Sequence, residues 1–132
     1  MALATDYALI GLSAITDPRQ RLRVRGHIEA TGRRVVDLST EQLTDFAGNA
    51  IELQGQEGRM LVMSRRAVDT LTTEQRDVIE AGSRIVPVDI GTIEHAGGSA
   101  RCMLAGIHLT PRTGCDIAEV QDVPDPGLVR PG

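Results

Sequence analysis

The chain has 132 residues, enough for one domain with a buried core, and its 41% hydrophobic and 24% charged residues are ordinary for a soluble globular protein. The formal net charge of −4 and the scarcity of aromatic residues argue against a basic, stacking surface that binds nucleic acid. No apolar stretch is long enough to span a membrane, and the first residues lack the pattern of a secretory signal. We therefore expect no membrane association and a reducing, cytoplasmic location.

The cysteine and glycine patterns exclude several classes of site. Cys102 and Cys115 are too few for a disulfide framework. No group of His, Cys, Asp and Glu has metal-ligand spacing, and no glycine-rich loop has the form of a nucleotide-binding motif. We therefore expect neither a metal nor an organic cofactor.

The first part of the chain predicts alternating strands and helices. In order, these are a strand over residues 7–12, a helix over 18–30, a strand over 34–38 and a short helix over 40–46. Asp17 followed by Pro18 is typical of a helix start, because proline lacks the N–H that the first turn leaves unpaired. Ser39 and Gln42 have the spacing of a capping box, which predicts the start of the second helix.

The following part predicts a hairpin, a helix and a strand. The expected elements are a strand over residues 50–53, a turn over 55–58, a strand over 59–64, a helix over 73–81 and a strand over 85–90. Ser64 and Thr72 are typical helix caps. The order of all these elements favours an α/β protein with an internal repeat. A last strand is expected over residues 103–109, and the Pro- and Gly-rich residues 110–132 are expected to be disordered.

The segment Gly97-Gly98-Ser99-Ala100-Arg101-Cys102 is the strongest candidate for a functional site. Glycines let the backbone turn sharply and approach a ligand closely. Cys102 is expected at the head of the last strand, and the positive charge of Arg101 favours the thiolate, the form that attacks electrophiles. The pattern predicts a nucleophile, although a cysteine taken alone is more often a small buried apolar residue.

Two neighbouring candidates have a structural interpretation beside a functional one. Arg101 either stabilises a thiolate or pairs with a surface carboxylate. Asn49 follows Gly48 at the entrance of an expected strand. It is either a turn residue that tolerates a left-handed backbone or a side chain that orients the loops of the site.

The ionisable candidates are weaker. His95 precedes Cys102 in a loop, and a Cys/His pair is a common route to an activated thiol, but nearness in sequence does not establish contact. Glu52 and Glu94 are either guanidinium ligands, since a carboxylate matches that planar group, or solvated carboxylates. His27 and His108 are interpreted as structural or surface residues.

Several motifs accompany the cysteine segment in the order and spacing of one enzyme group. They are residues 46–53 (FAGNAIEL), 61–67 (LVMSRRA), 86–90 (VPVDI), 92–94 (TIE) and 97–104 (GGSARCML). With them the chain, over roughly residues 3–109, resembles the C-terminal part of a guanidino-modifying enzyme of the pentein superfamily. This group includes arginine deiminases, amidinotransferases and dimethylarginine dimethylaminohydrolases. The likeness is greatest to bacterial amidinotransferase-like proteins described as citrulline-utilisation hydrolases.

The resemblance implies a partial α/β propeller, with about two ββαβ blades plus a closing strand in residues 1–109. It also implies a cysteine nucleophile that attacks a guanidinium or ureido carbon through a covalent thiouronium-type intermediate, while a histidine serves as acid and base. The family cysteine corresponds to Cys102, with Asn49, Gly98, Ser99 and Arg101 expected around the substrate. No histidine of this chain matches the family motif.

Two hypotheses follow from this resemblance. In the first, the chain is the C-terminal portion of a hydrolase, of amidinohydrolase or amidinotransferase type, that acts on a small arginine- or citrulline-like molecule. In the second, it is a truncated, catalytically silent fragment that associates with itself or with a missing N-terminal part. The second hypothesis has a physical basis, because an incomplete ring leaves strand edges unpaired.

Overall fold

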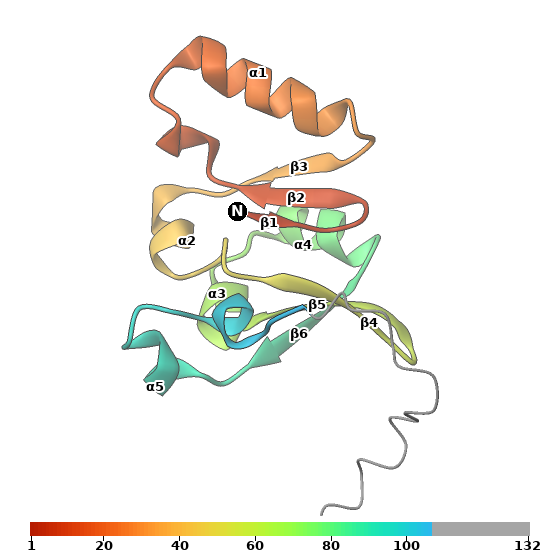
Figure 1. The fold of residues 1–132 in the computed structure, drawn as a ribbon, viewed down its shortest axis with the longest axis vertical. Coiled ribbons are helices and arrows are strands. Elements are labelled where there is room, and N and C mark those ends of the chain that lie inside the picture. The colour runs from red at the N-terminus through yellow and green to blue at the C-terminus, as the bar shows by residue number, and fades with distance from the viewer. Residues whose placement is uncertain (107–132) are drawn as a thin grey trace, which may run out of the picture.

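The computed structural model describes residues 1–106, which form two three-stranded sheets and the helices that connect their strands (Figure 1). The expected disordered tail over residues 110–132, including Cys115, and the end of the expected last strand lie outside the described residues. Within the described part of the chain, no helix has both the length and the apolar character needed to cross a membrane.

The first sheet has the order β1-β2-β3 and is formed by three short strands, β1 (Ala2–Leu3), β2 (Tyr7–Ile10) and β3 (Arg34–Asp37). β1 runs antiparallel to β2, whereas β3 runs parallel to β2 after the crossover helix α1 (Pro18–Glu29). This helix begins as expected, because the carboxylate of Asp17 accepts a hydrogen bond from the backbone N–H of Arg19.

The second sheet repeats this pattern with strands β4 (Ile51–Gly55), β5 (Gly58–Ser64) and β6 (Arg84–Val88). β4 and β5 form the expected hairpin, in which Gly55 pairs with Gly58 and Gly58 has a left-handed φ of 108° that favours glycine. Helices α3 (Arg65–Asp69) and α4 (Thr73–Glu80) then lead to β6, which is parallel to β5.

Side-chain caps fix the starts of three helices as the sequence predicts. Ser39 and Thr72 each form a capping box with the glutamine three residues later, ahead of α2 (Thr40–Thr44) and α4. The hydroxyl of Ser64 accepts the N–H of Ala67 in the first turn of α3. Each cap satisfies backbone groups that the helix cannot pair internally.

Both sheets therefore have one antiparallel and one parallel strand pair in the same order, with the helix connection before the parallel strand. The α/β class and the expected repeat are confirmed at this level, and the arrangement is compatible with a partial pentein fold. Among the strands of residues 1–106, only β1 was not predicted, because two residues are too few to show the alternation that indicates a strand.

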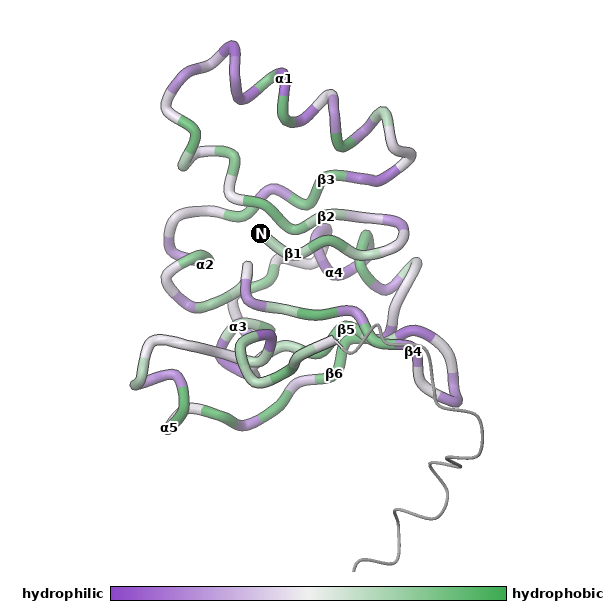
Figure 2. The backbone as a smooth tube through the Cα atoms, in the orientation of Figure 1, coloured by the Kyte–Doolittle hydropathy of each residue, from purple (hydrophilic) through white to green (hydrophobic). Residues whose placement is uncertain are grey.

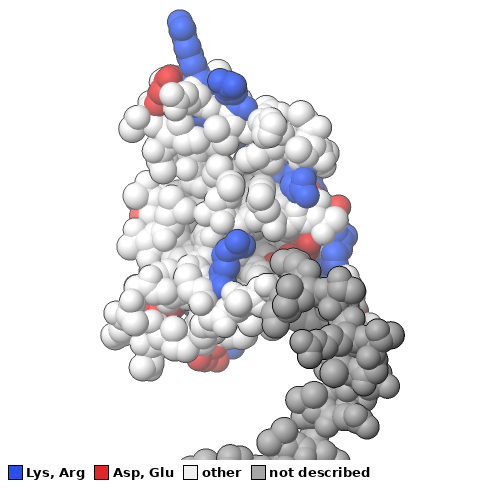
Figure 3. Space-filling model, viewed as in Figure 1, with Lys and Arg blue, Asp and Glu red and all other residues white. Residues whose placement is uncertain are grey.

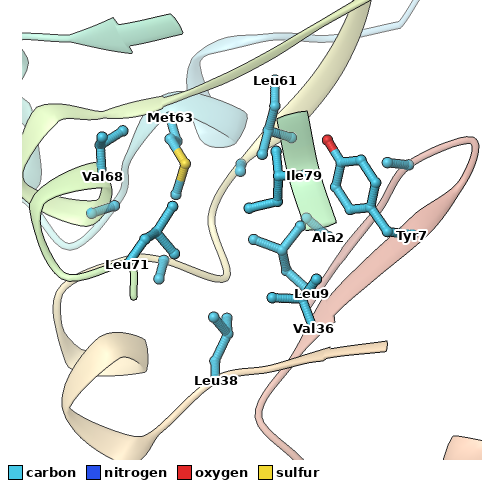
Figure 4. Packing of buried hydrophobic residues seen from close by; sticks show 14 residues of the cluster. Ala2, Tyr7, Leu9, Val36, Leu38, Leu61, Met63, Val68, Leu71 and Ile79 are labelled. Atoms are coloured by element: carbon cyan, nitrogen blue, oxygen red, sulfur yellow. The ribbon is translucent and has the colours of Figure 1, made fainter. Parts of the chain in front are cut away.

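The main core lies between the two sheets (Figure 4). Tyr7 and Leu9 of β2 contribute to it, as do Leu61 and Met63 of β5, because side chains two residues apart share one face of a strand. Ile79 of α4 belongs to the same cluster, and all five residues have no exposed surface. The core is mainly aliphatic, as the scarcity of aromatic residues predicts.

A smaller cluster lies on the opposite face of the first sheet, beneath α1. Ala8, Ile10 and Leu12 pack there against Ile28 of α1. Strand β2 is thus buried on both faces. Most residues of α1 are hydrophilic (Figure 2), and basic side chains project from this end of the molecule in Figure 3, as its arginines predict.

Two polar contacts join the turn between β1 and β2 to the second sheet. The carboxylate of Glu52 accepts hydrogen bonds from the backbone N–H and the hydroxyl of Thr5, at 2.8 and 2.6 Å, and from the hydroxyl of Ser83. Asp6 pairs with Arg59 at 2.5 Å. Both oxygens of Glu52 are therefore engaged: Oε2 joins the two sheets through Thr5, and Oε1 is bonded to Ser83 within the second unit.

The chain leaves β3 into α2 and leaves β6 into α5 (Gly91–Glu94), which is followed by a 3₁₀ helix over Ala100–Met103. Cys102 lies within this 3₁₀ helix. The expectation that it stands at the head of a strand is wrong, because residues 103–106 form no strand. The physical reason is local: the N–H of Cys102 donates to the carbonyl oxygen of Ser99 at 2.9 Å, a bond typical of a 3₁₀ turn.

Candidate active site

The turn after α2 presents Asn49 at the entrance of β4. Phe46 has a φ of 64°, a left-handed value that is unusual for a bulky residue and costs about 1–3 kcal/mol. The N–H of Asn49 donates to the carbonyl oxygen of Phe46 at 2.8 Å, and the flanking Ala47 and Ala50 are fully buried. Packing therefore holds this turn, and with it the backbone of Asn49.

The two glycines before Cys102 each have a definite role in the geometry. Gly97 has a φ of 87°, which reverses the chain after α5. A Cβ atom at Gly98 would lie 3.3 Å from Cβ and 3.6 Å from Sγ of Cys102, so a side chain at this position would crowd the cysteine. The glycines thus let the backbone pass closely beside the thiol.

Asn49 and Cys102 follow different sheets and meet through their side chains. The amide Nδ2 of Asn49 donates a hydrogen bond to Sγ of Cys102 at 3.0 Å. Its Oδ1 accepts one from the backbone N–H of Arg101 at 2.9 Å. The second bond sets the orientation of the amide, because a backbone N–H can only donate, and the amide nitrogen is left facing the sulfur.

The Cys102 side chain is exposed, and its surroundings favour the thiolate. The hydrogen bond from Asn49 is the main cause that lowers the pKa of Cys102, and a backbone hydrogen bond from Ser99 and the charge of Arg101 lower it further. Desolvation of the thiol acts in the opposite direction, with a larger effect than the Arg101 charge. An accessible thiol with a lowered pKa has the properties of a nucleophile.

Arg101 is exposed and forms no ion pair with any residue in the range 1–106. Of its two sequence interpretations, the surface ion pair is therefore not observed in this part of the chain. Its positive charge acts on the adjacent thiol instead.

The two ionisable candidates near the cysteine do not contact it. His95 is exposed at the end of α5 and lines a cavity of about 440 Å³ together with residues of α3 and β6, and no hydrogen bond joins it to Cys102. Glu94 is buried, and its Oε1 accepts a hydrogen bond from the Ser99 hydroxyl at 2.7 Å. The interpretation of Glu94 as a solvated carboxylate is therefore wrong, because the residue is buried.

The structure brings the five expected site residues together, but in different ways. Asn49 and Gly98 touch Cys102, and Arg101 flanks it, whereas the Ser99 hydroxyl is buried and turned towards Glu94. Sequence reasoning did not find the bond between Ser99 and Glu94, because it depends on a chain reversal at Gly97. Among the described side chains, no three His, Cys, Asp or Glu are grouped closely enough to hold a metal ion.

Comparison with known proteins gives one match. A family model described as eukaryotic N,N dimethylarginine dimethylhydrolase matches residues 1–109, and this range contains both sheets, Asn49 and Cys102. No curated protein and no solved structure matches the chain. The expected broad group of guanidino-modifying enzymes is confirmed, whereas the likeness to citrulline-utilisation hydrolases is not.

The match covers most of the chain and includes the segment in which an exposed, hydrogen-bonded thiol was found. The chain therefore belongs to the eukaryotic N,N dimethylarginine dimethylhydrolase family, a pentein-type family of hydrolases that act on C–N bonds of guanidino groups.

Proposed function

We propose that this chain carries the nucleophile of a hydrolase that acts on the guanidino group of an arginine-like small molecule, and that Cys102 is that nucleophile. The observation that carries the proposal is the 3.0 Å hydrogen bond from Asn49 to an exposed thiol in a member of this family. A donor at this distance stabilises negative charge on sulfur, which the attacking form requires.

The reaction has two steps. The Cys102 thiolate attacks the guanidinium carbon, the C–S bond forms, and the C–N bond to one nitrogen breaks as that nitrogen leaves with an added proton as an amine. Water then attacks the carbon of the thiouronium intermediate, the C–S bond breaks, and the sulfur leaves as thiolate. The product is a ureido compound, and the protons come from a general acid and return to a general base.

The neighbouring residues have separate roles in this proposal. Asn49 donates to the sulfur and, through its contact with Arg101, fixes where the sulfur lies. Gly98 leaves space beside the thiol for the planar head of the substrate. Arg101 adds positive charge that favours the thiolate, and we assign it no direct contact with a cationic guanidinium.

The family description favours a methylated guanidine over a free one. The preferred substrate in our proposal is therefore an N,N-dimethylated arginine, from which attack at the guanidinium carbon releases dimethylamine and leaves a ureido product. Arginine, which presents the same planar head without the methyl groups, and citrulline, which presents a planar ureido group instead, are the competing substrates.

The proton-transfer partner is not among the groups that residues 1–106 place at the thiol. No described histidine or carboxylate forms a hydrogen bond with Cys102. General acid–base catalysis contributes about 10²- to 10⁴-fold to rates. We therefore propose that this group is supplied from outside the described residues or by an associated polypeptide, and that the chain alone is nearly silent in turnover.

An open apolar surface also favours association. A groove of about 850 Å³ lies between β1 and α1, lined by Met1, Leu3, Val24 and Ile28 among others, and Leu3 is 55% exposed on an edge strand. Exposed edges and apolar grooves pair readily with other chains. We propose that this surface contacts a second copy or a further unit of the same protein.

The nucleophile can be tested without turnover. The chain is treated at neutral pH with chloroacetamidine, whose charged head resembles guanidinium, and in parallel with neutral chloroacetamide, and peptide mass spectrometry measures labelling of Cys102 and Cys115. We expect chloroacetamidine to label Cys102 faster than Cys115, with a preference over chloroacetamide that Cys115 does not show. Equal preferences at both cysteines, or an unreactive Cys102 in folded protein, would contradict the proposal.

Turnover tests the substrate. Dimethylamine release from N,N-dimethylarginine and ureido formation from arginine are compared for the wild type and Cys102→Ala. We expect slow release that is abolished by Cys102→Ala and is faster for the methylated substrate. Product formation that survives Cys102→Ala would show that another residue is the nucleophile.

A further inference from the structure

Beside the exposed contact between Asn49 and Cys102, the loop that leads to the cysteine contains a buried contact. The hydroxyl of Ser99 donates to Oε1 of Glu94 at 2.7 Å. Ser99 has no exposed surface, and Glu94 is 5% exposed. A buried carboxyl group needs a partner, and this serine provides one.

Ser99 is also tied directly to the nucleophile through its backbone. Its carbonyl oxygen accepts the N–H of Cys102 at 2.9 Å. A hydrogen bond from the Ser99 backbone is the second cause of the lowered pKa of Cys102, after the bond from Asn49. The position of the Ser99 backbone therefore fixes the amide of Cys102 and contributes to the lowered pKa of its thiol.

The segment that leads into Ser99 has little stiffness of its own. It consists of Gly97 and Gly98, and glycine has the largest backbone freedom of any residue. The carbonyl oxygen of Glu94 accepts the N–H of Gly97 at 3.0 Å, so Glu94 holds both ends of this short reversal, one through its backbone and one through its side chain.

We propose that Ser99 and Glu94 are positioning residues for Cys102, which act by fixing the glycine reversal so that the Ser99 backbone stays against the thiol. This inference rests on the proposed role of Cys102 and changes the expected role of Ser99, whose buried hydroxyl makes no direct contact with substrate. The Glu94 carboxyl group touches Ser99 and not the sulfur, so its effect on the thiol passes through the loop. Arg101 is the charged group that acts on the thiol directly.

The test measures the alkylation rate of Cys102 by iodoacetamide as a function of pH, in a Cys115→Ser background that leaves one thiol. Ser99→Ala removes the hydroxyl. We expect the rate at neutral pH to fall about tenfold, the scale set by losing one hydrogen bond to the thiolate, and the inflection of the pH profile to move to higher pH.

Ser83→Ala is the matched control, because Ser83 is also a buried serine bonded to a glutamate, but that glutamate is Glu52 of β4 and not a residue of the cysteine loop. We expect Ser83→Ala to lose about as much thermal stability as Ser99→Ala, but to keep the wild-type pH profile of Cys102 alkylation. If Ser99→Ala also leaves the profile unchanged, the positioning role is overturned and the contact is only structural.

Glu94 provides a second test if Ser99→Ala does not fold. Glu94→Ala removes the acceptor and is expected to slow alkylation as Ser99→Ala does, whereas Glu94→Gln keeps an acceptor oxygen and should retain most of the rate. A Glu94→Ala protein with the wild-type profile would overturn the inference. Failure of the proposed function has a different signature, because the wild-type thiol itself would then lack enhanced reactivity.

Discussion

The two sheets of this molecule share one topology but differ in what covers them. Helix α4 of the second unit lies in the shared core, where Ile79 is fully buried and Val78 packs against the same cluster (Figure 1). Helix α1 occupies the corresponding place in the first unit, yet only Ile28 on it is buried and Leu22 is 70% exposed. The crossover helix of the second unit is therefore buried against the first unit, whereas the crossover helix of the first unit has an exposed outer side.

The units also differ in the loop that follows their last strand. The connection after β3 carries Asn49, and the connection after β6 carries Cys102. The two halves of the candidate site are thus contributed by corresponding connections of a structural repeat. Packing between the sheets is consequently a requirement for the contact between amide and thiol.

The largest expected effect comes from the shared core. Leu9→Ala should lower the free energy of unfolding by about 2–5 kcal/mol, because Leu9 is fully buried between the sheets and truncation leaves a cavity. Leu22→Ala on α1 is the matched control and should change it by less than about 0.5 kcal/mol. Urea unfolding followed by circular dichroism measures both variants. Equal effects would refute the difference between the shared core and the exposed side of α1.

The polar contact between the units has a smaller expected effect. Glu52→Ala should lower the free energy of unfolding at neutral pH by about 1–3 kcal/mol, because Thr5 and Ser83 lose their acceptor. Glu80→Ala, at an exposed site on α4, is the control. A Glu52→Ala protein as stable as this control would show that the contact does not hold the sheets together.

The same contact should depend on pH. Burial raises the pKa of Glu52, but hydrogen bonds from Ser83 and Thr5 outweigh it, so the pKa lies below its ordinary value. Its stabilisation is therefore complete above about pH 4.3, the ordinary pKa of glutamate, and is lost as pH falls through the lower folded value. The stability difference between wild type and Glu52→Ala should shrink in acid, and a constant difference would contradict this assignment.

The smallest effect on stability is expected at the open edge. Leu3→Lys places a charge on β1 beside the apolar groove and should change the free energy of unfolding by less than about 0.5 kcal/mol. Self-association measured by analytical ultracentrifugation should decrease. Association that is unaffected by Leu3→Lys would place the contact surface elsewhere.

Local signals in the sequence predicted most of the fold. The caps at Asp17, Ser39 and Thr72 depend on residues within a few positions, and the structure shows all three. The two-residue strand β1 gave no such signal, since it becomes a strand only by pairing with β2. Its existence depends on a tertiary contact, which sequence alternation does not report.

The site was predicted in its composition but not in its connections. Motif order indicated Cys102 and Asn49, but it gave no sign that the buried serines Ser83 and Ser99 engage the carboxylates of Glu52 and Glu94. The 3₁₀ helix around Cys102 was also missed. An apolar run after a cysteine favours a strand locally, and the hydrogen bond to Ser99 opposes it.

The most direct test of the account is the ionisation of Cys102, followed by the ultraviolet absorbance of the thiolate in the Cys115→Ser background. We expect a pKa below the ordinary value of about 8.5 for a free thiol, and an increase when Asn49→Ala removes the amide donor. A pKa at or above the ordinary value, or one that Asn49→Ala leaves unchanged, would contradict the claim that two repeated units together prepare a nucleophile.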